Sequence, residues 1–255
     1  MKQPSKTTHT DNLKKFSNHH TVSHYRLENN LQKCESYIFG KYLRAETDIL
    51  DIGVGAGRTT SILSSENRRY VGIDYSEPMT SSCRIKYPNL TFHTLDAVDL
   101  SLFKDGTFDE AVFSFNGIDY IYPDKKRLKC ICEVHRILRP NGVFIFSTHS
   151  SKALIIYPQL KSIDFVKKFY RLMRSFGKSI LLITKQIRRK SFYSGDGYLY
   201  DPVHGGLMTH ASIPKIIECE LAENGFELIE TISANYPTRS GVYTSPWFYY
   251  VAKKI

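Results

Sequence analysis

The sequence has few cysteines, and their spacing gives neither a disulfide framework nor a metal site. Five cysteines are scattered along 255 residues, and no two of them stand in a Cys-x-x-Cys pair. An odd, scattered set is not typical of a small disulfide scaffold, and structural zinc sites need ligands at defined spacing. We therefore expect reduced thiols and no bound metal.

Long apolar runs are also missing. No stretch approaches the roughly 20 apolar residues that span a bilayer, and the N-terminal region is polar and His-rich rather than of signal-peptide type. Hydrophobic residues nevertheless make up 42% of the chain, which excludes a disordered protein and suits one large domain. We expect a cytoplasmic monomer or homodimer, with a polar, flexible tail over residues 1–24 and a single domain over residues 25–255.

Two common phosphate-binding signatures are absent. The chain has glycines at Gly53, Gly55 and Gly57, but the dinucleotide fingerprint G-x-G-x-x-G would need a third glycine where Arg58 stands. No Gly-Lys-Ser/Thr occurs either, which excludes a P-loop. The glycines therefore serve another ligand, or they only make a tight turn.

What the sequence does have is a regular alternation of strands and helices. Hydrophobic periodicity and turn residues predict strands over Asp48–Ile52, Tyr70–Asp74, Leu90–Leu95, Asp109–Phe115 and Gly142–Thr148. They predict helices over Gly57–Ser65, Glu77–Tyr87 and Asp124–Leu138. Continuous runs of Val, Ile and Phe suit a sheet that is covered on both faces. The pattern predicts a Rossmann-like, doubly wound, mostly parallel α/β sheet.

Two additions frame this core. A helix is expected around Arg26–Leu43, and residues 151–210 form an insertion after the fifth strand, which we expect to be a helical lid beside the acceptor. The alternation then resumes with a helix over Ser212–Asn224, a strand over Phe226–Ser233 and a last strand in "PWFYYVAKK". The result is a seven-stranded sheet with an antiparallel last strand.

The glycine-rich loop and several later stretches resemble the motifs of class I S-adenosylmethionine-dependent methyltransferases. A G-x-G-x-G loop follows the acid Asp51, Asp74 ends the second strand, and "LDA" at residues 95–97 ends the third. "FDEAVFSFNG" and "VHRILRPNGVFIFS" resemble the later motifs of the family. The resemblance covers residues 35–150 and, more loosely, 211–255. It implies that the methyl donor is S-adenosylmethionine, that the product is S-adenosylhomocysteine, and that no metal takes part.

The resemblance and the chemistry of the donor together give each residue near the loop an expected role. Ligands of parallel sheets bind at the carboxyl ends of the strands. Asp51 is expected to hold the cationic amine, Asp74 the ribose hydroxyls and Asp96 the adenine amino group. The other expected cofactor-binding residues are Gly53, Gly55, Gly57, Arg58, Tyr75, Ser76, Met79, Ala97, Phe115, Asn116 and Tyr25. The alternative is that Asp51 and Asp96 only cap helices or turns.

The acceptor has to be inferred from residues that follow the fourth and fifth strands. Methyl transfer from a sulfonium is a direct displacement, and a base is needed only if the acceptor atom loses a proton. The expected catalytic residues are His149, Asp119 and His204, and the expected acceptor-binding residues are these three with Tyr120, Tyr200 and Tyr243. The alternative for each aromatic residue is ordinary packing. Aromatic faces beside one carboxylate suit a cationic acceptor, so we expect N-methylation of an amine- or guanidine-like metabolite, with O-methylation of a small metabolite as the alternative.

The charge distribution leaves a second question open. Between Lys152 and Lys190 stand eleven Lys/Arg and one acid, so this stretch alone accounts for the net charge of +10. Residues 161–190 read as a basic amphipathic segment, which fits a lid, an anionic membrane surface or an RNA backbone. The chain lacks the Asn/Asp-Pro-Pro-aromatic run and the Pro-Cys pair of two classes of nucleic-acid methylases. We therefore expect a small-molecule partner rather than a nucleic acid, with RNA, membrane lipid or quinone methylation as the alternatives.

Overall fold

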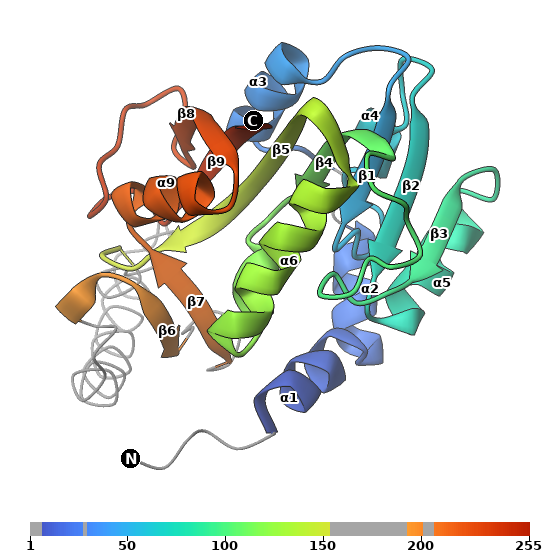
Figure 1. The fold of residues 1–255 in the computed structure, drawn as a ribbon. Coiled ribbons are helices and arrows are strands. Elements are labelled where there is room, and N and C mark those ends of the chain that lie inside the picture. The colour runs from blue at the N-terminus through green and yellow to red at the C-terminus, as the bar shows by residue number, and fades with distance from the viewer. Residues whose placement is uncertain (1–6, 28–29, 154–192, 201–206) are drawn as a thin grey trace.

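A nine-stranded sheet forms the centre of the structure (Figure 1), a computed structural model that describes residues 7–27, 30–153, 193–200 and 207–255. The strand order is β3-β2-β1-β4-β5-β7-β6, and β9 pairs with both β5 and β8. The strands are β1 (Asp48–Ile52), β2 (Arg69–Asp74), β3 (Thr91–Thr94), β4 (Phe108–Phe113), β5 (Leu138–Ser150), β6 (Gly197–Tyr200), β7 (Met208–Ser212), β8 (Phe226–Ser233) and β9 (Trp247–Lys254).

The pairing confirms the predicted doubly wound sheet. Strand β1 runs parallel to β2 and β4, β5 runs parallel to β4, and β9 is antiparallel to β5 and β8. The predicted count of seven strands is too low for the described residues. Strands β6 and β7 extend the sheet beside the end of β5, where His149 pairs with Ala211. They are short and carry no alternating apolar pattern, which is the signal that sequence analysis depends on.

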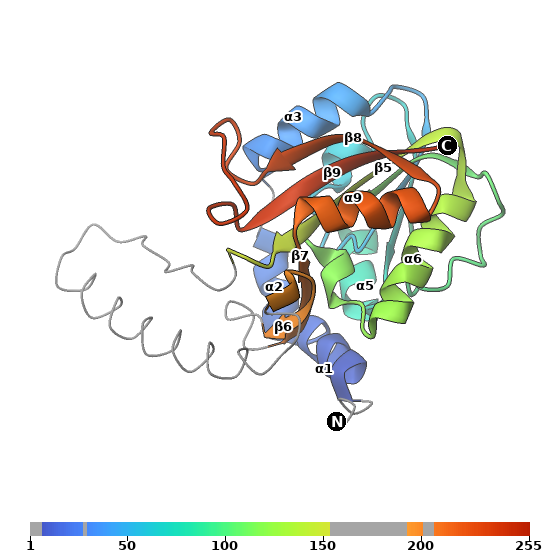
Figure 2. The same ribbon diagram turned by 60° about the vertical axis from the view of Figure 1, so that its left-hand side comes forward.

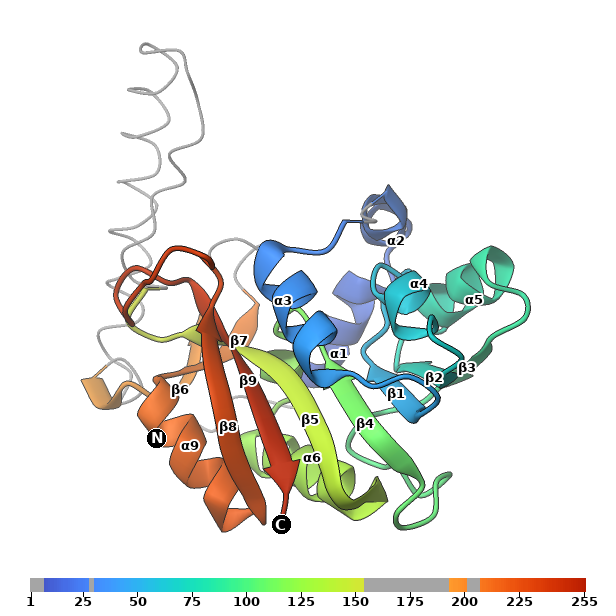
Figure 3. The ribbon, with the colours of Figure 1, turned by 90° about the horizontal axis from the view of Figure 1, so that it is seen from above.

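Helices cover both faces of the sheet, which explains why its central strands are apolar without alternation. Figure 3 shows α3 (Lys33–Tyr42), α4 (Thr60–Leu63) and α5 (Glu77–Lys86) on one face, and α6 (Asp124–Ile137) and α9 (Pro214–Glu223) on the other. The buried apolar residues divide accordingly into two large clusters, one containing Ile38 and Leu63, the other Ile131 and Ile217.

The N-terminal segment is helical from Thr7, in a region where sequence analysis expects a polar tail over residues 1–24. Helices α1 (Thr7–Phe16) and α2 (His19–Leu27) lie at the same end of the sheet as β6 (Figure 2). Asn12 is buried, and its Nδ2 donates a hydrogen bond of 2.8 Å to the carbonyl of Tyr120. Their polar composition concealed these helices, because sequence analysis depends on apolar residues at helical spacing.

Two further expectations need correction or lie outside the described residues. The helix after the glycine-rich loop is shorter than predicted, because the backbone has positive φ at Gly55 and Gly57 and becomes helical only at Thr60. Most of the insertion over residues 151–210, including the basic segment 161–190, is not among the described residues; its described end supplies β6 and part of β7. In the part of the chain that the structure describes, no helix is long and apolar enough to cross a bilayer.

Candidate active site

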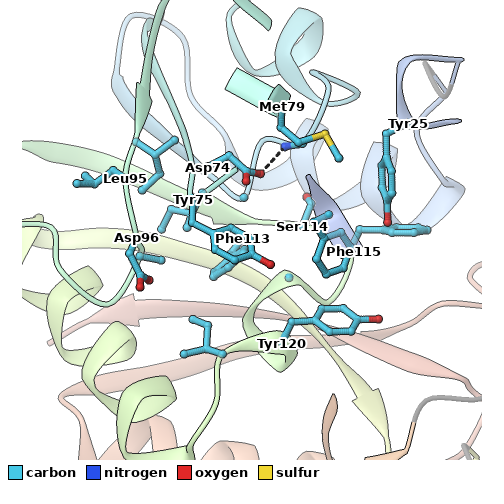
Figure 4. A pocket seen from close by; sticks show the side chains of 18 residues that line it. Tyr25, Asp74, Tyr75, Met79, Leu95, Asp96, Phe113, Ser114, Phe115 and Tyr120 are labelled. Carbon is cyan, nitrogen blue, oxygen red and sulfur yellow. Dashed lines mark hydrogen bonds between the residues drawn. The ribbon is translucent and has the colours of Figure 1, made fainter. Parts of the chain in front are cut away.

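The carboxyl ends of β1 to β4 surround a pocket of about 860 Å³ that opens to solvent (Figure 4). Leu95 and Asp96 lie at one side of the pocket, and Tyr25 and Phe115 lie at the other. Phe16 of α1 and Tyr25 of α2 belong to the wall. The N-terminal helices therefore complete a site that the sheet begins.

The glycine-rich loop approaches the pocket at two residues that need glycine for different reasons. A Cβ at Gly55 would project toward Tyr25 and find its nearest atom at 3.9 Å, so a side chain there would enter the pocket. A Cβ at Gly53 would stand 2.6 Å from Phe113 Cε2, so this glycine makes room for an aromatic ring. Gly57 does not line the pocket, and a Cβ there would meet Tyr87 at 2.9 Å. The loop thus packs closely against side chains at Gly53 and Gly57, whereas its backbone is open to the pocket at Gly55.

Asp74 lies on the pocket wall and is tied to this loop. One of its carboxylate oxygens accepts a hydrogen bond of 2.9 Å from the Gly55 backbone N–H, and the other accepts one of 2.9 Å from the Ser76 N–H. Burial raises the pKa of Asp74 to about 6, although both backbone donors favour the charged form. Each carboxylate oxygen has more than one acceptor site. The carboxylate can therefore accept hydrogen bonds from a ligand without releasing the loop.

Asp51 does not line the pocket, in contrast to the expectation that it holds the cofactor amine. It is buried, and one carboxylate oxygen accepts hydrogen bonds from the hydroxyls of Thr59 at 2.8 Å and Tyr70 at 2.9 Å. Burial raises the pKa of Asp51 to about 7, and the two hydroxyls oppose this rise. In this structure Asp51 joins β1, β2 and the residue before α4, as in the capping alternative.

Arg58 also points away from the pocket wall. It donates two hydrogen bonds of 2.6 Å to the buried carboxylate of Glu35, which in turn accepts one of 2.5 Å from the Tyr249 hydroxyl. The Arg58 guanidinium carbon lies 4.9 Å from the centre of the Phe115 ring. Because Phe115 lines the pocket, Arg58 and Glu35 support the wall from behind. Glu35 was missed because a glutamate in a helix usually reads as a solvent-facing residue.

The residues expected around the adenine all line the pocket: Tyr75, Met79, Asp96 and Ala97. Tyr75, Met79 and Asp96 are labelled in Figure 4. Asp96 also accepts a hydrogen bond of 3.1 Å from the Val98 N–H, so it shapes the turn after β3 as well. Ser76 does not line the pocket; its hydroxyl lies 3.1 Å from that of Ser17, next to α1.

A second group of polar side chains lies behind Tyr120, after β4 and in the last residues of β5. Asp119, in the 3₁₀ helix η1 (Gly117–Tyr120), accepts hydrogen bonds from His149 Nδ1 at 2.7 Å and from the His149 backbone N–H at 2.8 Å. A ring nitrogen bonded to a carboxylate carries the proton, so Nε2 of the neutral ring has the lone pair. Asn116 Nδ2 lies 3.3 Å from that Nε2.

This arrangement corrects the expected role of Asp119. The Asp119 side chain is fully buried, so it orients His149 and is not in a position to contact an acceptor. His149 is 11% exposed, and its ring lies edge-on to Tyr120, with 6.3 Å between the ring centres. Tyr120 itself lines the pocket, whereas Asn116 and His149 stand just behind the wall. The Tyr120 ring therefore separates His149 and Asp119 from the pocket.

The remaining expected residues divide into three cases. Tyr25 and Phe115 line the pocket. Tyr243 does not, because its side chain is 62% exposed on the connection before β9. The backbone of Tyr200 pairs with Met208 in β6 and β7, but its side chain is not described. His204 lies outside the described residues.

Several wall residues were not predicted. Ile52, Ile73, Leu95 and Phe113 stand at strand ends, so strand position alone could have found them. Phe16 carried no such signal, because it follows a polar stretch that reads as a tail. The other unpredicted wall residues are Ser114, Gly117 and Ile121. In the described part of the chain, no three potential ligands among His, Cys, Asp and Glu come together as a metal site would require.

Comparison with known proteins identifies methyltransferases as similar in sequence. Residues 50–146 match the family model described as "Methyltransferase domain". The chain is 29% identical over 157 residues to "Putative methyltransferase YqeM" of Bacillus subtilis, covering 60% of this chain and 62% of that protein. It is 26% identical over 139 residues to the ubiquinone/menaquinone biosynthesis C-methyltransferase UbiE of Citrifermentans bemidjiense, covering 51% of this chain and 57% of the relative. The chain thus spans less than two thirds of the length of these relatives.

A solved structure shows the same fold over the whole chain. The 1,6-didemethyltoxoflavin-N1-methyltransferase of Burkholderia thailandensis, solved with 1,6-didemethyltoxoflavin and S-adenosylhomocysteine bound, superposes with a TM-score of 0.64. It is 14% identical and covers 100% of this chain and 93% of its own. At this identity the likeness concerns the fold.

Proposed function

Since the chain belongs to the class I S-adenosylmethionine-dependent methyltransferase family, we propose that it transfers a methyl group from S-adenosylmethionine to a small molecule. The observation that carries the proposal is the hydrogen bond from the Gly55 N–H to the Asp74 carboxylate, since both residues lie on the wall of the pocket of about 860 Å³. A carboxylate and open backbone at the carboxyl edge of the sheet suit a nucleoside with an amino-acid tail.

The cofactor would lie along the row of wall residues that the glycine-rich loop begins. Asp74 would accept hydrogen bonds from the ribose hydroxyls, and Asp96 would accept one from the adenine amino group. The methionine part would pass Gly55 toward Phe115 and Tyr25, at the other side of the pocket in Figure 4. When bound, the donor supplies an electrophilic methyl group on a cationic sulfur.

The residues beside Tyr120, where the acceptor would bind, favour a substrate that loses a proton when it is methylated. Asp119 is committed to His149, so the carboxylate that favoured a cationic amine does not face the pocket. What the described residues offer is a base, the Nε2 lone pair of His149, close behind Tyr120. We therefore propose an acceptor whose oxygen or nitrogen carries a hydrogen, such as an acidic hydroxyl or a ring N–H. An imidazole with a free ring nitrogen is a common general base.

The proposed step balances in atoms and charge. A bond forms between the acceptor atom and the methyl carbon while the carbon–sulfur bond breaks, and sulfur keeps that electron pair to become a neutral thioether. The proton of the acceptor atom passes to His149 Nε2. The Asn116 amide, 3.3 Å from this nitrogen, has to turn aside or be displaced by the acceptor. Asp119 then faces a positively charged ring, which its carboxylate stabilises.

A metabolite screen tests this function. The full chain is incubated with S-adenosylmethionine and pools of phenols, enols, heteroaromatic N–H compounds, amines and quinols, and mass spectrometry records S-adenosylhomocysteine and a product heavier by one CH₂ group. We expect turnover with an O–H or N–H acceptor, reduced in Asp74→Asn when S-adenosylmethionine is limiting and strongly reduced in His149→Gln. Methylation of a quinol carbon would favour the second candidate, which the likeness to UbiE supports. Failure of S-adenosylhomocysteine to bind would refute the proposal.

A further inference from the structure

Behind His149 lies a histidine that the chemistry above does not use. His210 belongs to β7, which joins the sheet beside the end of β5, and its side chain is fully buried. His210 Nδ1 lies 3.6 Å from Asp119 Oδ1, and His210 Nε2 lies 3.2 Å from Asp196 Oδ1. The ring therefore stands between two carboxylates, one buried and one 36% exposed.

The two histidines share one carboxylate. Asp119 Oδ2 takes the hydrogen bond from His149, and Asp119 Oδ1 faces His210. A buried carboxylate needs a compensating partner, because an isolated charge in the interior is costly. If one ring carries a positive charge, that charge opposes protonation of the other ring across Asp119.

The surroundings decide which of the two rings holds the charge. Burial lowers the pKa of His210, but Asp119 and Asp196 raise it more, so that the net shift is upward. Arg127 of α6 opposes this rise, but its guanidinium is itself paired with Glu220 at 2.6 Å. Tyr198 of β6 packs edge-on against His210, with 5.4 Å between ring centres. His149 has Asp119 as its only carboxylate partner among the described residues, whereas His210 has two.

We propose that His210 is a positioning residue of this site: it carries the positive charge between Asp119 and Asp196, so that His149 stays neutral and keeps its Nε2 lone pair for the acceptor's proton. This inference rests on the proposed role of His149. Strands β6 and β7 would then contribute to the site as well as extending the sheet, because Asp196 precedes β6 and His210 lies in β7.

The test follows the protonation of His149 itself and needs no acceptor. The full-length protein is labelled with ¹⁵N-histidine, and the ring nitrogens of His149 are assigned with His149→Gln and titrated by NMR. We expect wild-type His149 to be neutral near pH 7 with its proton on Nδ1. In His210→Gln, and independently in Asp196→Asn, the His149 ring should take up its second proton at a higher pH than in the wild type, because the positive charge across Asp119 has been removed.

Controls separate this effect from damage to the fold and from failure of the proposed function. His93→Gln, a change to a histidine that packs on Phe103 in the cofactor half, should leave the His149 titration unchanged. Binding of S-adenosylhomocysteine by calorimetry should be unaffected in His210→Gln and Asp196→Asn. An unchanged His149 titration in both variants would overturn the inference while leaving methyl transfer untouched. Conversely, loss of cofactor binding in the wild type would refute the proposed function alone.

Discussion

Replacing Asp51 by asparagine should make the stability of this protein much less dependent on pH. Asp51 is buried, its pKa is raised to about 7 from an ordinary 3.8, and both of its hydrogen bonds come from hydroxyl donors. An asparagine oxygen can accept the same two hydrogen bonds. The substitution therefore removes the ionisation and keeps the shape.

The sign of the effect follows from proton linkage. Between pH 3.8 and about pH 7 the folded protein holds a proton on Asp51 that the unfolded chain has released. The free energy of unfolding therefore falls as the pH rises through this window. Above about pH 7, Asp51 is ionised in both states and no longer changes it. Each pH unit is worth about 1.4 kcal/mol, so between about pH 5 and about pH 8 the wild type should lose roughly 3 kcal/mol that Asp51→Asn retains.

Urea unfolding of both proteins over this pH range measures the difference directly. We expect the free energy of unfolding of Asp51→Asn, relative to the wild type, to increase steadily with pH and to level off above pH 7. Asp74, whose pKa is also raised, is present in both proteins and enters the comparison only through its charge interaction with Asp51. Parallel pH profiles for the two proteins would refute the buried, protonated state of Asp51.

The other predictions concern the pocket and its loop. Asp74→Asn should weaken S-adenosylhomocysteine binding by about 1–3 kcal/mol, the cost of losing charge-assisted hydrogen bonds, whereas Asp51→Asn should leave it nearly unchanged; calorimetry decides both. Binding to the wild type should weaken as the pH falls through about 6, because protonation removes acceptor capacity from Asp74; a flat profile would contradict this. Gly53→Ala should lower stability by about 1–2 kcal/mol from its positive φ alone, with a further loss from the Phe113 contact. Its matched control, Gly40→Ala in α3, meets no atom within 4 Å and should gain about 0.5–1 kcal/mol in thermal or urea unfolding.

Much of the central fold could be predicted because its signals are local. The bounds predicted for β1 and β8 agree with the structure, and α5 and α6 end within one residue of prediction. Apolar runs, a proline before Asn141-Gly142 and the glycine-rich loop mark these elements directly. Asp74, Tyr75 and Asp96 could be placed at the pocket for the same reason, since each stands at or just after a strand end whose position the sequence indicates.

The sequence by itself determined that a parallel sheet places a glycine-rich loop and an acid at one edge, because strand period and turn residues are properties of neighbouring residues. Only the tertiary structure decided which side chains face the pocket. Asp51 is turned to Thr59 and Tyr70, and Asp119 to His149, because each buried carboxylate takes the nearest donors. His210 became visible only when β7 was placed beside β5, since that contact joins segments about sixty residues apart, and no local pattern encodes it.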